Sequence, residues 1–186
     1  STVTWSRGDG DVRVSQETNY PEDSSVKLSI AMQKPARFAL KFRVPAWTRG
    51  ATAAVNGQRV DAPFTPGSWG TITREWRDGD RVELDIPLVM RLEPVDSFHP
   101  DRVAAVRGPV VLVLDGDWQD PNFNLPMHND ELARWLVADP KQPGVFHVHP
   151  PGGKRVMPKF QPFYAVAENY PYKMYFDRNV PVAKLW

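Results

Sequence analysis

The 186-residue chain contains no cysteine. It therefore cannot form disulfides, zinc–thiolate centres or iron–sulfur clusters, and it offers no thiol as a catalytic nucleophile. Long apolar runs are also missing, because the most continuous one, Val110 to Leu114, falls far short of the ~20 residues that a membrane helix needs. These absences exclude cysteine chemistry from the chain and argue against a membrane partner.

A dense run of basic residues is absent as well. The 23 lysines and arginines are spread along the sequence and nearly balanced by 22 acidic residues, for a net charge of +1. Proteins that bind nucleic acids or anionic membranes carry a basic patch or stripe. We therefore expect neither partner. The chain begins at Ser1 without a methionine, so we interpret it as part of a longer protein and leave its cellular compartment open.

Proline, in contrast, is abundant, with 19 residues. This is about twice its usual share of ~5%, and because proline removes an amide donor, the chain cannot hold many long helices. Apolar and polar residues alternate at period two in several stretches, as in 26–30, 38–44 and 82–86. Such alternation is typical of strands with one buried and one solvated face. The sequence therefore predicts an all-β fold.

Two turn signals lie in the first half of the chain. Asn56-Gly57 stands between apolar segments and favours a two-residue type I′ hairpin, because both turn residues need positive φ. We predict a second hairpin at Arg77 to Asp80, between strands at 69–76 and 82–86. Short strands at turn spacings of roughly 8–12 residues indicate an antiparallel, jelly-roll-like β-sandwich.

The second half is less regular. Val110 to Leu114 is suited to a strand buried on both faces. One short helix is expected near residues 129–138, capped by Asn129 and ended by Pro140. Further strands are predicted at 144–149, 163–168 and 172–176. We expect two packed sandwich lobes, 1–95 and 96–186, which can interleave.

Candidate chemistry is sparse. His147 and His149 share one face of a predicted strand, but two imidazoles fall short of the usual set of metal ligands. The acidic segment Asp115 to Asp120 is better explained as a solvated loop than as a calcium site. Acidic residues such as Glu17 and Glu83 are plentiful, yet no pair indicates a glycosidase centre. We predict no catalytic residue, no metal site and no cofactor in this chain.

Seven tryptophans are more than expected for this length. Aromatic faces can stack on sugar rings, and Trp5, Trp47 and Trp118 lie in or beside predicted loops where they could form such a platform. Trp69 and Trp76 are interpreted as sheet packing. The alternative for most of the seven is packing in a core or at a domain interface.

A series of short motifs resembles the C-terminal β region of glycoside hydrolase family 127, the β-L-arabinofuranosidase family. The motifs occur in the family's order across nearly the whole chain: Gln16–Pro21, Phe42–Trp47, Val55–Gly57, Ile72–Asp80, Val103–Val111 and Phe160–Tyr164.

The resemblance implies a bacterial parent enzyme whose chemistry belongs to an N-terminal (α/α)6 barrel with a zinc-bound cysteine. This chain has neither the cysteine nor a succession of amphipathic helices. The resemblance therefore implies a non-catalytic accessory β-sandwich portion that supports the missing barrel. The partners it implies are that barrel, an arabinose-containing oligosaccharide or a second copy in a homodimer. The alternative is an independent carbohydrate-binding module with an exposed aromatic platform.

Overall fold

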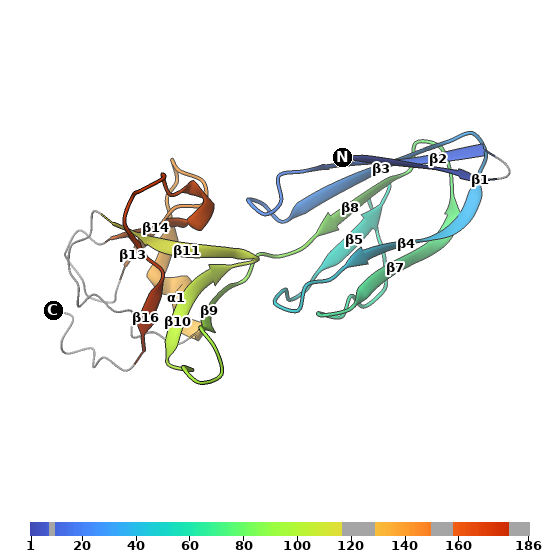
Figure 1. Ribbon diagram of the computed structural model, residues 1–186. Helices are drawn as coiled ribbons and strands as arrows, with labels where there is room; N and C mark the ends of the chain where they lie inside the picture. The colour runs from blue at the N-terminus through green and yellow to red at the C-terminus, as the bar shows by residue number, and fades with distance from the viewer. Residues whose placement is uncertain (8–9, 117–128, 150–157, 179–186) are drawn as a thin grey trace. The chain divides into compact units, whose positions relative to one another are not determined.

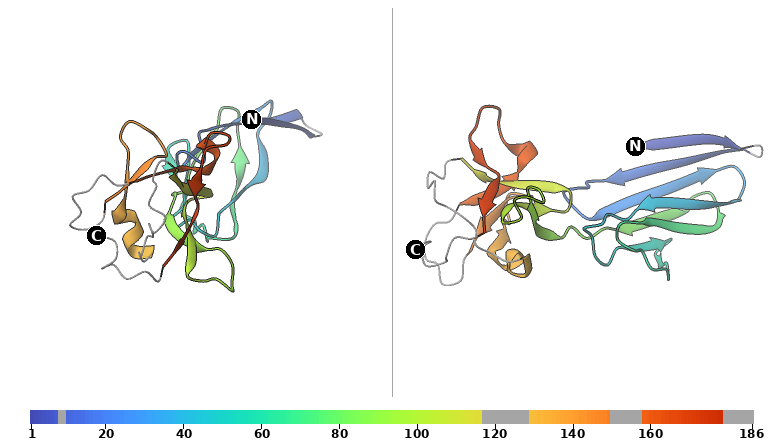
Figure 2. Two further views of the ribbon diagram at one scale, coloured as in Figure 1. Left: turned by 60° about the vertical axis from the view of Figure 1, so that its left-hand side comes forward. Right: turned by 60° about the horizontal axis from the view of Figure 1, so that its bottom comes forward.

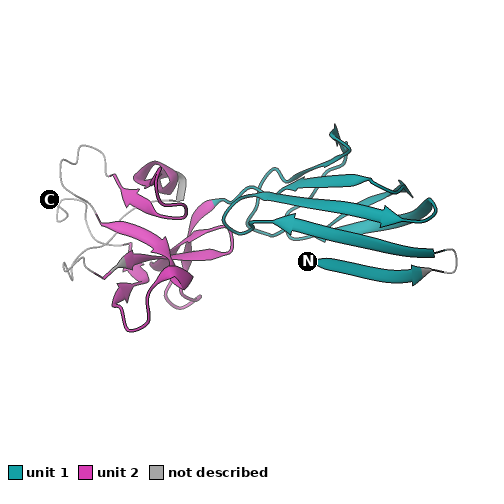
Figure 3. Cartoon of the chain, turned by 90° about the horizontal axis from the view of Figure 1, so that it is seen from above, with its two compact units in different colours: residues 1–89 teal, residues 90–186 magenta. Residues whose placement is uncertain are grey.

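The computed structural model describes residues 1–7, 10–116, 129–149 and 158–178. The chain divides into two compact units, Ser1–Val89 (unit 1) and Met90–Trp186 (unit 2), coloured separately in Figure 3. The predicted boundary after residue 95 assigns β9 (Met90–Pro94) to the first lobe. In the structure this strand pairs with β10 (Arg102–Arg107) and so belongs to unit 2. That each unit is an independently folding domain stays a prediction.

Unit 1 is built from two antiparallel sheets, which can be followed in Figures 1 and 2. The larger sheet has the strand order β1-β2-β3-β8-β5-β6 and the smaller one consists of β4 and β7. The strand bounds are β1 Thr2–Arg7, β2 Gly10–Thr18, β3 Ser25–Met32, β4 Ala36–Arg43, β5 Thr52–Val55, β6 Gln58–Arg59, β7 Trp69–Trp76 and β8 Arg81–Asp85.

The inward faces of both sheets meet in one apolar cluster. In β8, Val82 and Leu84 are buried while Glu83 is exposed, as the period-two pattern predicts. The cluster draws on both sheets: Val12, Val26, Ile30, Met32, Ala53, Val55, Ile72, Trp76, Val82 and Leu84. The prediction of an antiparallel β-sandwich is confirmed here.

The Asn56-Gly57 turn is confirmed as the hairpin between β5 and β6. Asn56 has φ of 52° and Gly57 has φ of 78°, so both residues adopt the positive φ of a type I′ turn. The side chain of Asn56 also binds outside its own hairpin, because its Oδ1 accepts a hydrogen bond from the Arg81 N–H at 2.8 Å.

The second predicted hairpin, at Arg77 to Asp80, is wrong. β7 before it pairs with β4, whereas β8 after it pairs with β3 and β5, so the turn carries the chain from one sheet to the other. The physical reason lies in the partners of the turn's backbone. Gly79 N–H donates to Ile30 O, and Ile30 N–H donates to Asp80 O, both at 2.9 Å. These hydrogen bonds attach the turn to β3, and β8 therefore pairs with β3 and not with β7.

All strands in the described part of unit 2 join a single eight-stranded sheet. Its main order is β12-β13-β14-β11-β10-β16, with β9 paired to β10 and β15 paired to β11. The remaining strand bounds are β11 Val110–Asp115, β12 Leu136–Ala138, β13 Phe146–Val148, β14 Lys159–Pro162, β15 Tyr172–Lys173 and β16 Tyr175–Asp177. Side chains of this one sheet and of a helix thus together form the core of this unit.

That helix, α1, spans Asn129–Trp135 and contributes the buried Leu132 and Trp135 to the core of unit 2. It ends three residues before the predicted position 138, because Leu136–Ala138 pairs with β13 as β12. The strand expected at 163–168 is also different. No strand forms over 163–168: β14 ends at Pro162, before this range, and Phe163–Ala165 forms a short 3-10 turn, η1.

Candidate functional site

Trp5, one of the three predicted platform residues, lies inside β1 instead of in a loop. It is half-buried and stands opposite Val12 of β2. Its ring meets Phe38 edge-on, with ring centroids 5.7 Å apart, and Phe38 in turn stacks on the buried Trp76. Trp5 therefore packs against the core of unit 1.

Trp47, the second of these residues, lies in the connection between β4 and β5 and is half-buried. The turn around it is closed by the Thr48 N–H, which donates to Pro45 O at 3.2 Å. Thr48 is fully buried, and its hydroxyl donates to Pro87 O at 2.9 Å. Trp118 lies outside the described residues. A shared sugar platform of Trp5, Trp47 and Trp118 stays a prediction.

Among the described residues of unit 1, the aromatic residue with a large exposed surface is instead Trp69, at the start of β7, with 64% of its surface exposed. Trp69 and Trp76 are seven residues apart on one strand, and an odd separation places them on opposite faces. Trp76 occupies the buried face and is fully inaccessible, which agrees with its interpretation as sheet packing. The same interpretation of Trp69 is wrong, and counting the parity along the strand would have revealed this.

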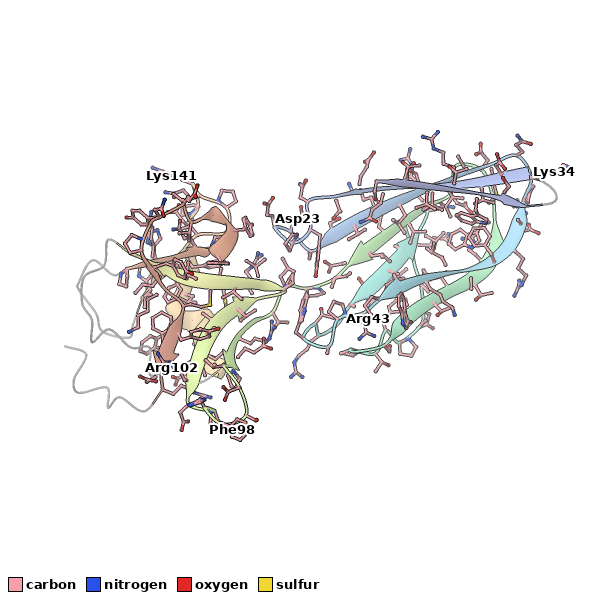
Figure 4. All side chains as sticks on the ribbon, viewed as in Figure 1. Asp23, Lys34, Arg43, Phe98, Arg102 and Lys141 are labelled. Carbon is pink, nitrogen blue, oxygen red and sulfur yellow. The ribbon has the colours of Figure 1, made fainter. Side chains whose placement is uncertain are left out.

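The surface around Trp69 is the outer face of the two-stranded sheet. We call it the Trp69 face, and its exposed residues alternate along the two strands: Arg37, Ala39, Lys41 and Arg43 on β4, with Trp69, Thr71, Thr73 and Glu75 on β7. Arg43 stands directly opposite Trp69, and Lys41 stands opposite Thr71. Figure 4 marks Arg43 at the end of β4. The face combines one large ring, cations and small hydroxyl residues.

A second polar surface lies on the six-stranded sheet. Two hollows of about 440 Å³ and 290 Å³ share Glu17 and Lys27 in their walls. The first extends to the β2–β3 connection, where Figure 4 marks Asp23, and the second extends to Glu83 on β8.

The register of the strands places Glu17 and Glu83 on one face of this sheet. Both stand directly opposite Lys27, on its two neighbouring strands, so the strands carrying the carboxylates are about 10 Å apart. Glycosidases need a comparable separation, but with the scissile bond between the two groups. Here the lysine occupies the intervening strand, and all three residues are exposed. The arrangement suits a solvated polar surface better than an enclosed catalytic site.

In unit 2, His147 pairs with Asp139. The Nε2 atom of His147 lies 2.8 Å from Oδ2 of Asp139, and Oδ1 of Asp139 accepts the Lys141 N–H at 2.7 Å. The ring centroids of His147 and His149 are 6.5 Å apart. The hydrogen bond from His147 and then that from the Lys141 N–H hold the pKa of Asp139 below its ordinary value. The geometry is that of a carboxylate fixing a strand to the connection before it.

We expect this pair to make unit 2 sensitive to acid. A carboxyl group with a lowered folded-state pKa stabilises the fold above its unfolded pKa, about 3.9 for aspartate, and that stabilisation is lost as pH falls through the folded value. Asp139→Asn should therefore flatten the loss of stability below about pH 4. The measurement is urea unfolding between pH 2.5 and 6, with the exposed Asp101→Asn as control. Identical acid profiles for Asp139→Asn and the unmodified chain would contradict the assignment.

Exposed aromatic residues also gather in unit 2, within and near η1. Phe163 and Tyr172 are each 45% exposed and Tyr164 is 60% exposed. The rings of Phe163 and Tyr172 meet at 64°, with centroids 5.2 Å apart. This group of exposed rings was not predicted, because a strand was expected at 163–168 and a regular strand would turn alternate side chains inward.

A zinc–thiolate centre does not fit this chain. The sequence has no cysteine, and no group of three or more histidine, aspartate or glutamate side chains gathers within the described ranges. In the same ranges, no helix is long and apolar enough to cross a membrane.

Comparison with solved structures finds proteins that are similar to this chain in fold. A GH127 β-L-arabinofuranosidase from Geobacillus stearothermophilus T6 is 24% identical, with a TM-score of 0.70 over 95% of this chain and 32% of that one. A glycoside hydrolase gives 21% identity and a TM-score of 0.71, over 95% of this chain and 34% of that one. A GH127 β-arabinofuranosidase is 23% identical, with a TM-score of 0.67 over 98% of this chain and 34% of that one. This chain thus shares its fold with about a third of each of these proteins.

The family comparison is narrower. Residues 1–88, nearly all of unit 1, match the model of the GH127 β-L-arabinofuranosidase middle domain. No curated protein sequence matches the chain. Because the matched model describes a middle domain, the C-terminal placement of the whole chain stays a prediction.

Proposed function

We propose that this chain is a non-catalytic, accessory β portion of a bacterial GH127-type glycoside hydrolase and that it supports a separate catalytic barrel. The observation that carries the proposal is the match of residues 1–88 to the GH127 middle domain, because that match coincides with the compact unit 1. The likeness in fold of nearly the whole chain to a third of each solved enzyme supports the same assignment.

A non-catalytic role agrees with the side chains that the chain offers. The resemblance to GH127 implies a cysteine nucleophile, and cysteine is absent. The carboxylates that come closest to a glycosidase arrangement, Glu17 and Glu83, stand on an open sheet face with Lys27 on the strand between them. A catalytic pair needs a water-excluding cleft and room for a sugar between the two groups.

The exposed aromatic residues of unit 2 are our candidate for contact with the barrel. Phe163, Tyr164 and Tyr172 expose large ring surfaces, and such residues are enriched in the cores of protein interfaces. Two of them belong to the Phe160–Tyr164 motif on which the resemblance to GH127 rests. We propose that these rings pack against the catalytic barrel. A homodimer stays a prediction.

The test is binding between this chain and a separately produced catalytic barrel of the same enzyme, measured by calorimetry and by the melting temperature of the barrel. We expect a stable complex and a higher melting temperature. The double variant Phe163→Ser, Tyr172→Ser should weaken the complex about tenfold or more, because interface aromatics carry much of the binding energy. Val137→Ser, at an exposed apolar residue of β12, is the control. Lack of any complex at micromolar concentrations would refute the accessory role.

A further inference from the structure

The Trp69 face carries an exposed indole among polar side chains. Exposed large apolar residues scattered singly are common, so the exposure of Trp69 alone has no special meaning. Its surroundings are what distinguish it. The neighbouring outward residues Thr71 and Thr73, with Ala39 on β4, have short side chains. A ligand that lies along β7 therefore meets only the short side chains of Thr71 and Thr73 next to the ring.

Two of the three cations of this face lie beside the ring. Arg43 is directly opposite Trp69 and Lys41 is its diagonal neighbour, at Cβ separations of about 5 and 7–8 Å for such pairs. Nη1 of Arg43 donates to Gly67 O at 2.6 Å, which holds the guanidinium at the Trp69 end of the sheet. A guanidinium has further N–H donors, so this bond leaves some for a ligand.

The one carboxylate of the face lies at the end far from Trp69 and forms an ion pair with an arginine. Glu75 stands six residues from Trp69, and its Oε1 is 3.2 Å from Nη2 of Arg77. Arg37 is the residue directly opposite Glu75. The acidic charge is therefore balanced locally, and the Trp69 end of the face keeps the charges of Lys41 and Arg43.

We propose that the Trp69 face binds saccharides that carry carboxylate groups, that is, uronic-acid oligosaccharides. The indole stacks on the C–H face of a sugar ring. Arg43 and Lys41 pair with carboxylates on that ring or its neighbour, and the threonine hydroxyls bond to sugar hydroxyls. Charge complementarity favours this ligand over a neutral sugar, which would leave both cations unused. Charge complementarity also favours the acidic saccharide over an apolar protein partner, because such a partner would bury the two cations without pairing them.

This inference goes beyond the accessory role and does not depend on it, since the ligand site lies on unit 1 and can be tested without a barrel. The probe is tetragalacturonic acid, titrated into the full chain by calorimetry at 20 mM and 200 mM salt. The matched ligand is its fully methyl-esterified form, which keeps the sugar rings and removes the charges. We expect binding of the acid at millimolar concentration or below, at least tenfold weaker binding of the ester, and weakening by salt.

Variants locate the site. Trp69→Ala and Lys41→Gln should each weaken binding of the acid about fivefold or more, while Trp69→Phe should retain most of it because an aromatic face remains. Lys27→Gln, which removes a cation from the other sheet of unit 1, is the control and should change nothing. Equal affinity of the acid and its ester, or unchanged binding by Trp69→Ala, would overturn the proposal.

Discussion

Replacing Trp76 by alanine should lower the stability of unit 1 by about 3–5 kcal/mol, the usual cost of deleting a large buried aromatic side chain. Trp76 is fully inaccessible to solvent, and its ring stacks on Phe38 with centroids 5.7 Å apart. Its indole N–H donates to Phe38 O at 3.0 Å, so truncation leaves both a cavity and an acceptor without its partner. A loss of this size is a large part of the stability of a small domain.

Hydrogen exchange of the full chain gives the measurement, because it reports the opening of each unit separately. We expect faster exchange throughout β4 and β7 in Trp76→Ala. Trp69→Ala is the matched control on the same strand and should change stability by no more than about 0.5 kcal/mol, as surface substitutions usually do. Equal effects of the two substitutions would show that the two faces of β7 are wrongly assigned.

Replacing Asp80 by alanine is the second substitution with a large expected effect. Asp80 is 7% exposed, and it holds two turns together. Its Oδ1 accepts from Asn56 Nδ2 at 2.8 Å, and its Oδ2 accepts from the Arg77 N–H at 2.9 Å. Bonds to a charged group contribute about 1.5–3 kcal/mol each, and the alanine variant loses both. We therefore expect unit 1 to lose about 3 kcal/mol or more.

The pH dependence of Asp80 provides a further check. Burial raises its pKa, but the hydrogen bonds from Asn56 and the Arg77 N–H, with the nearby arginine charges, outweigh that effect and lower the pKa overall. The carboxylate therefore stabilises unit 1 above the ordinary aspartate pKa of about 3.9, and its contribution is lost as pH falls through the lower, folded-state value. We expect the free energies of unfolding of Asp80→Ala and the unmodified chain, measured with urea, to differ less at pH 3 than at pH 7. Asp85→Ala, at an exposed position of β8, is the control, and a loss equal to that of Asp80→Ala would refute the network.

The strands and the hairpin of unit 1 could be predicted because their signals are local. Alternation of apolar and polar residues depends only on the two-residue period of a strand. The positive φ values of Asn56 and Gly57 follow from the residue types themselves. The buried run Val110 to Leu114 likewise became the core strand β11, which pairs with β10 and β14.

The errors arose where a strand's partner is distant in sequence. Arg77 to Asp80 has the composition of a hairpin turn, yet which sheet receives β8 is decided by the pairing with β3, some fifty residues earlier. The early end of α1 has a nearer cause, because Leu136–Ala138 is extended by its pairing with β13, about ten residues later in the chain. Partner choice of this kind depends on the whole fold and is not visible in a window of sequence.

The candidate site was harder to predict than the fold. Assigning tryptophans to loops or to sheets said nothing about which face of a strand each one occupies. Trp5 turned out to pack on Phe38, whereas Trp69 became the exposed ring of a cationic face. The parity between Trp69 and Trp76 was readable in the sequence, but the neighbouring Arg43 and Lys41 came beside Trp69 only through the register of β4 on β7.

We propose above all that this chain supports a glycoside hydrolase without performing its chemistry. The most direct test is incubation of the purified full chain with p-nitrophenyl β-L-arabinofuranoside, with and without added zinc. We predict release of p-nitrophenol at the rate of buffer alone. Release that rises in proportion to the concentration of the chain and follows the chain through gel filtration would contradict the claim.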